Sequence, residues 1–130
     1  MKSIVMTAPG QVVVQDVPMP IRKPGETLLR LRYGGICGSD LGSYRGRIST
    51  SATRAPSAMN SPPRLWRRIR PGQLVTCNPY FNCGACYSCR RGFVNCCVNN
   101  QTMGVQREGA FAEYITVPTE RVYSGEGIAP

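Results

Sequence analysis

The chain has 130 residues, 42% of them hydrophobic, so it is long enough to bury one modest core and too apolar for a disordered chain. It carries a formal net charge of +9, seven cysteines and no histidine. No segment approaches the length of a membrane span, and residues 1–10 contain no apolar run of signal-peptide length. We therefore expect no membrane partner and a reducing, cytoplasmic compartment, where clustered cysteines bind metal more often than they form disulfides.

The sequence predicts short strands joined by turns, with one short helix. In chain order these are strands over residues 2–7, 11–17 and 26–35, a tight turn and short helix over 37–46, and strands over 73–80 and 109–118. Pro9 and Gly10 separate the first two strands and predict a hairpin. Ser39 or Asp40 is placed to cap the helix. This pattern predicts a mainly β protein, a small barrel or sandwich.

Residues 48–70 interrupt this pattern. They contain five arginines, no acidic residue and few side chains that could pack, so this segment alone supplies +5 of the formal charge of +9. Such a basic stretch raises nucleic acid as a partner. A nucleic-acid surface usually combines several aromatic and basic side chains, and this segment has a single tryptophan. We therefore expect no nucleic-acid partner.

Residues 80–100 form a loop rich in cysteine, glycine and asparagine, with little hydrophobic periodicity. Cys83, Cys86 and Cys89 follow one another at intervals of three, and two further cysteines, at positions 96 and 97, come next. Two intervening residues let consecutive thiolates face one ion, and a fourth thiolate completes a tetrahedron. The spacing therefore favours a structural zinc that takes the place of an apolar core.

Two other interpretations of the cysteine loop remain open. The same spacing begins the bacterial ferredoxin pattern of an iron–sulfur cluster, but that pattern continues with a cysteine and a proline after three residues. Here six or seven residues separate Cys89 from the next cysteines, and no proline follows them. Free surface thiols or disulfides are the least favoured interpretation, because so many exposed thiols would be open to oxidation.

Four segments occur in the order found in one known family: GICGSD at 35–40, PGQLVTCNPY at 71–80, the cysteine loop, and GAFAEYITVP at 109–118. On these segments the chain resembles the N-terminal, GroES-like catalytic domain of the zinc-dependent medium-chain alcohol and polyol dehydrogenases. The resemblance covers residues 1–47 and about 70–130. It implies one domain over 1–130, with the fold of a partly open GroES-like β-barrel and a zinc-binding lobe at 80–100.

The resemblance also implies roles for single residues. It assigns four cysteines to a structural zinc: Cys83, Cys86, Cys89 and Cys97. Cys97 is preferred to Cys96 because Gly92 stands five residues before it, as in the family. Cys37 takes the place of the first ligand of a separate catalytic zinc, and Ser39 that of the hydroxyl that relays the substrate's proton. Without the flanking motif, Cys37 would be interpreted as a small apolar residue buried after a strand, and Ser39 as the cap of a helix.

The family's chemistry follows from its catalytic zinc. An open-site zinc with three protein ligands binds the alcohol oxygen and lowers its pKa, so that hydride passes to NAD or NADP. The resemblance implies a small-molecule alcohol, polyol or sugar-acid substrate, and a homo-oligomer as in most of the family. The family's Y-P-R-x-P-G-H-E segment supplies a histidine and a glutamate to this centre, whereas the present chain has no histidine. The chain also has no G-x-G-x-x-G, and it stops where relatives continue into a Rossmann domain.

A shifted reading frame would explain residues 49–70. When Ala58, Met59 and Asn60 are back-translated and read from the third base of each codon, the triplets permit His and then require Glu, at the family's position. The shifted codons upstream permit Tyr-Pro-Arg, and those downstream permit an apolar strand. We therefore expect a frameshift with a small deletion that removes a central barrel strand and leaves the chain inactive.

Two alternatives to the damaged-dehydrogenase hypothesis remain. The first is that residues 48–70 are a true insertion that forms a basic, disordered linker, since their composition fits disorder. The rival function is a non-catalytic zinc-binding module whose arginine-rich segment contacts RNA or DNA. Salt-sensitive binding that depends on Arg64, Arg67 and Arg68 would favour that rival.

Overall fold

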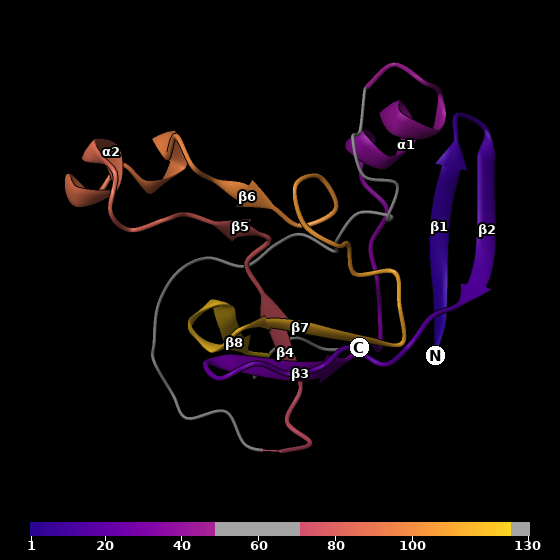
Figure 1. Ribbon diagram of the computed structural model, residues 1–130, viewed down its shortest axis with the longest axis horizontal. Coiled ribbons are helices and arrows are strands. Elements are labelled where there is room, and N and C mark those ends of the chain that lie inside the picture. The colour runs from indigo at the N-terminus through magenta and orange to yellow at the C-terminus, as the bar shows by residue number, and fades with distance from the viewer. Residues whose placement is uncertain (49–70, 126–130) are drawn as a thin grey trace.

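A computed structural model of the chain describes residues 1–48 and 71–125 (Figure 1). Its elements, in chain order, are β1 (Lys2–Ala8), β2 (Gln11–Asp16), β3 (Glu26–Arg30), α1 (Gly38–Tyr44), β4 (Val75–Cys77), β5 (Tyr80–Phe81), α2 (Tyr87–Arg90), the 3-10 turn η1 (Val94–Cys96), β6 (Gln101–Thr102), β7 (Tyr114–Pro118), the 3-10 turn η2 (Thr119–Arg121) and β8 (Val122–Ser124). The prediction of a mainly β protein is confirmed for these residues. No described helix is long and apolar enough to cross a membrane.

The N-terminal hairpin forms as predicted. β1 pairs antiparallel with β2, from Lys2 opposite Asp16 to Ala8 opposite Gln11. Gly10 adopts a φ of +76° in the turn between the strands, a left-handed conformation that residues with a Cβ rarely take. Buried residues occur in β1, whereas every residue of β2 is exposed. Only one strand of the hairpin therefore contributes to the interior.

Segments from the two ends of the described chain lie side by side (Figure 1). β3 pairs antiparallel with β7, and the residues just before β7 extend this contact to β1. The Ile4 N–H donates to the Phe111 carbonyl at 2.8 Å, and Ser3 forms a β-bridge with Ala112. The Lys2 N–H donates to a carboxylate oxygen of Glu113, 111 positions later, at 2.7 Å. The first strand is thus held by residues far along the sequence.

A small apolar core connects the β3–β7 ladder with the ladder of β4 and β8. Its buried members are Met103, Ala110, Val117 and Val122. Partly buried residues of all these ladders and of β5 pack against them: Leu29, Val75, Cys77, Phe81 and Ile115. The side chain of Val117, the fourth of the five residues of β7, is fully buried. The core therefore depends on the C-terminal strands more than on the N-terminal hairpin.

Several boundaries differ from the predictions. The strand predicted over 26–35 ends at Arg30, because its pairing with β7 ends there, opposite Tyr114. The strand predicted from residue 109 begins at Tyr114, and β8 follows it. β8 was missed because three residues are too few to show an alternation. The predicted loss of a central strand concerns residues 49–70, which lie outside the described residues.

The cap of α1 comes from one of the two predicted residues. Cys37 occupies the N-cap position, and its N–H donates to the Asp40 Oδ2 atom at 2.6 Å. Asp40 therefore caps the helix from the third helical position, as the carboxylate of a capping box does. Ser39 lies exposed within the first turn and does not cap the helix.

Truncation of the central core residue is expected to destabilise the fold. Val117→Ala removes both methyl groups from a side chain that is 0% exposed. At about 0.8 kcal/mol per buried carbon, with a further cost for the cavity, the free energy of unfolding should fall by about 2 kcal/mol. Urea denaturation followed by circular dichroism measures this change. The matched control is Val14→Ala on β2, where the side chain is 66% exposed and the loss should stay below about 0.5 kcal/mol. Equal losses in the two variants would contradict this placement of the core.

Candidate metal centre

Five of the seven cysteines lie in a lobe formed by residues 80–102, which we call the cysteine lobe. It contains β5, α2, η1 and β6, and Figure 1 shows it projecting away from the β1–β2 hairpin. Neither α2 nor η1 contains a buried residue, although Phe93 and Val94 are apolar. Apolar burial therefore does not account for the order of this lobe, which agrees with the prediction from its sequence.

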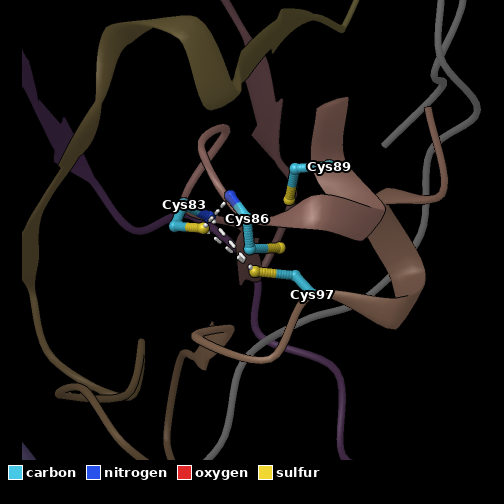
Figure 2. Close-up of side chains that lie close together, drawn as sticks. All are labelled: Cys83, Cys86, Cys89 and Cys97. Atoms are coloured by element: carbon cyan, nitrogen blue, oxygen red, sulfur yellow. Dashed lines mark hydrogen bonds between the residues drawn. The ribbon is translucent and has the colours of Figure 1, made fainter. Parts of the chain in front are cut away.

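Four cysteine sulfurs converge inside the cysteine lobe (Figure 2). They belong to Cys83, Cys86, Cys89 and Cys97, and all lie within 4.8 Å of one another. The Cys83 and Cys97 Sγ atoms are 3.6 Å apart. A tetrahedral zinc with bonds of about 2.3 Å to four sulfurs requires sulfur–sulfur distances of about 3.8 Å. The cluster therefore fits a tetrahedral zinc in both donor chemistry and spacing.

Glycine turns bring the four sulfurs together. Gly84 has a φ of +70° and lets the chain turn tightly after Cys83, so that the Cys86 N–H donates to the Cys83 sulfur at 3.4 Å. Cys86 is the N-cap of α2, which places Cys89 nearly one turn further along the helix. Gly92, with a φ of +84°, then reverses the chain towards η1 and the fourth cysteine. The spacing of the motif thus includes two positions, Gly84 and Gly92, that require a left-handed backbone.

The cluster divides its thiols into easily and poorly ionised ones. Hydrogen bonds from the backbone N–H groups of Ala85 and Cys86 lower the pKa of Cys83 to about 6. The pKa of Cys86 is also lowered, chiefly by the N–H of Cys89. Burial raises the pKa of Cys89 to about 11. Cys83 therefore ionises near neutral pH and Cys86 more readily than an ordinary thiol, and a bound dication would supply the charge that favours ionisation of the others.

Two asparagines near the cluster were missed by sequence reasoning. The Asn82 side-chain amide lies 3.8 Å from the Cys89 sulfur, and the Asn99 amide lies 3.8 Å from the Cys83 sulfur. Amide donors stabilise thiolate charge and orient metal ligands from the second coordination sphere. Their proximity in sequence could have indicated this role, because Asn82 precedes the first clustered cysteine and Asn99 lies two residues after the last.

The remaining cysteines of the lobe and core lie outside the cluster. Cys96 is exposed and does not join the four sulfurs, although it neighbours one of them in sequence. Cys77 lies on β4, where burial raises the pKa of its thiol. These two thiols provide matched controls for changes at the cluster.

The second predicted centre has no complete ligand set among the described residues. Cys37 is partly buried and Ser39 is exposed at the start of α1. Among residues 1–48 and 71–125, no group of three or more metal-binding side chains includes Cys37. A catalytic zinc needs three protein ligands, and the chain has no histidine to complete them. Asp40 is only 6% exposed, and its Oδ1 atom has no hydrogen-bond partner among the described residues.

The mainly β fold and its four-cysteine lobe define a zinc-type, GroES-like domain. Residues 23–126 match the family described as the alcohol dehydrogenase GroES-like domain. The chain therefore belongs to this family, that of the zinc-type medium-chain alcohol dehydrogenases, and the resemblance seen in the sequence is confirmed.

Individual relatives agree with this assignment. The chain is 33% identical over 126 residues to an uncharacterized zinc-type alcohol dehydrogenase-like protein of Haemophilus influenzae, covering 90% of this chain and 36% of the relative. It is 33% identical over 143 residues to an L-threonine 3-dehydrogenase of Pyrococcus horikoshii, covering 100% and 40%. A crystal structure from Escherichia coli CFT073, described as a short chain alcohol dehydrogenase complexed with NADH, has a TM-score of 0.82 at 30% identity and covers 99% and 40%. The chain thus spans about two fifths of the length of these relatives.

Proposed function

We propose that this chain forms the structural-zinc domain of an NAD- or NADP-linked, zinc-dependent dehydrogenase, and that the chain as written does not transfer hydride. One observation carries the proposal: a complete four-cysteine cluster occurs in a family domain whose catalytic centre lacks its histidine. The L-threonine dehydrogenase and the NADH-bound E. coli alcohol dehydrogenase support an alcohol substrate and a nicotinamide cofactor for the complete enzyme, and we propose polyols and sugar acids as further members of its substrate class.

The structural zinc would be held by the four clustered sulfurs of Cys83, Cys86, Cys89 and Cys97. When bound, such a zinc supplies strong cross-links between loops and takes no part in hydride transfer. The chain's own groups prepare the site: backbone N–H groups hold Cys83 towards its thiolate form, and the Asn82 amide reaches the more buried sulfur of Cys89. This arrangement supports a role in holding the lobe together.

The family's catalytic roles fall on residues at the start of α1. We assign Cys37 as the thiolate ligand of the catalytic zinc and Ser39 as the hydroxyl that holds the substrate's proton. The position of Cys37 at the N-cap, fixed by the Asp40 carboxylate, supports this assignment. Since the remaining ligands are missing, these residues cannot complete the centre in this chain.

The aberrant segment accounts for the missing ligands. We propose that residues 49–70 arise from a shifted reading frame within a domain that extends over 1–130. The required glutamate in the shifted triplets supports this origin, and reading the encoding DNA on both strands tests it directly. An unbroken frame exactly as translated, with no neighbouring base that restores His-Glu, would contradict it.

Metal and cofactor analysis of the purified chain tests the proposed function. We expect one zinc per chain by mass spectrometry, no change in that content in Cys37→Ser, and no NADH binding or alcohol oxidation. The reason is that only the cysteine lobe offers a complete ligand set among the described residues. A second zinc that is lost in Cys37→Ser, or any zinc-dependent hydride transfer, would contradict the proposal.

A further inference from the structure

The outer edge of the cysteine cluster is accessible. Cys83 is exposed, whereas Cys86 and Cys89 are partly buried. No heavy atom lies within 4 Å of the position where a side chain would begin at Gly84, so the space beside Cys83 is open. A small polar oxidant can therefore approach the Cys83 sulfur without displacing other parts of the lobe.

A second sulfur stands within reach of the first. The Cys83 and Cys97 Sγ atoms are 3.6 Å apart, and a disulfide requires about 2.05 Å, so the two must approach by about 1.5 Å. The Cys83 N–H donates to the Cys97 sulfur at 3.3 Å, which holds the two segments together. Since neither α2 nor η1 contains a buried residue, little packing opposes such a shift.

We propose that Cys83 and Cys97 are a peroxide-sensitive pair, whose oxidation to a disulfide releases the zinc of the cysteine lobe. This inference rests on the proposed structural zinc. It assigns Cys83 as the thiolate that reacts with hydrogen peroxide and Cys97 as the residue that resolves the product.

The step balances with hydrogen peroxide as the oxidant. The Cys83 sulfur attacks one peroxide oxygen, the O–O bond breaks, and the departing hydroxide takes up a proton to form water. The Cys97 sulfur then attacks the resulting sulfenic acid, an S–S bond forms, and the second hydroxide leaves as water with another proton. Two sulfurs lose two electrons together and peroxide gains them. Cys86 and Cys89 stay reduced, and two ligands are too few for a structural zinc site.

The experiment uses the zinc-loaded full chain and hydrogen peroxide. Zinc release is followed by the absorbance of a zinc-binding dye, and the products are alkylated and digested with trypsin. Cleavage at Arg90 and Arg91 separates Cys83 from Cys97, so a disulfide between them appears as a cross-linked pair of peptides. Fragmentation of this pair identifies the linked cysteines, since each peptide holds more than one. We expect one zinc released and one such cross-link per chain, both reversed by dithiothreitol and fresh zinc.

The matched control is Cys96→Ser, which removes the exposed cysteine next to the cluster. It should release zinc at the same rate and form the same cross-link. A zinc-loaded chain that keeps its zinc, releases it without a disulfide, or links Cys96 instead would overturn the inference while leaving the zinc site intact. A chain that holds no zinc before peroxide is added would overturn the proposed zinc site, and this inference with it.

Discussion

Cys89→Ser is expected to weaken zinc binding by at least about 100-fold. Zinc in structural sites prefers thiolate and imidazole ligands, and changes in the outer sphere alone cost about 10- to 100-fold. Cys89 belongs to the four-sulfur cluster, and burial raises the pKa of its thiol to about 11. A serine hydroxyl there would stay neutral and would not replace the thiolate. Competition with a chelator of known affinity measures the loss.

The control for this change is Cys96→Ser. Cys96 is exposed and lies outside the cluster, so its replacement should leave zinc affinity unchanged within about twofold, as surface changes usually do. Similar losses in the two variants would mean that the cluster does not select its ligands as the structure indicates. Full retention of zinc in Cys89→Ser would also contradict the four-sulfur site.

Removal of zinc from the intact chain is expected to unfold the cysteine lobe and spare the core. The lobe's helical turns depend on short-range hydrogen bonds such as Arg90 N–H to Cys86 carbonyl (3.0 Å), with no buried side chain beneath them. Hydrogen exchange should become fast throughout residues 83–99 after chelation, because opening a region without apolar contacts costs little. Amides of β7, which contains the fully buried Val117, should keep most of their protection.

Comparing hydrogen exchange in the cysteine lobe with that in β7 distinguishes local from global effects of zinc. Loss of protection in the lobe and in β7 together would show that zinc supports the whole fold. Unchanged protection in the lobe would show that zinc does not order it. Adding zinc back should restore slow exchange in the lobe, which separates metal loss from irreversible damage.

The sequence predicted those parts of the fold that depend on short-range patterns, such as turn residues and the spacing of cysteines. The Pro-Gly turn between two β-branched runs predicted the β1–β2 hairpin. Cysteine spacing predicted that Cys83, Cys86 and Cys89 gather, whereas the choice of Cys97 rather than Cys96 came from the family resemblance. The burial of Asp40 and the amide donors Asn82 and Asn99 depend on the tertiary fold, which no local pattern reports. β8 was missed because it is a strand only through its pairing with β4. The predicted frameshift segment lies outside the described residues and stays a prediction.

The contact between β1 and the residues before β7 has a consequence for synthesis on the ribosome. The hairpin can form as soon as its own residues emerge, but Ser3 donates its hydroxyl to the Phe111 carbonyl, 108 positions later. Such distant pairing slows folding, because the chain loses the entropy of closing a long loop before the contact stabilises the fold. The inward-facing residues of β1 therefore stay exposed during most of translation. This topology therefore favours binding of a chaperone to the nascent hairpin. The chaperone would be released once residue 113 has left the exit tunnel.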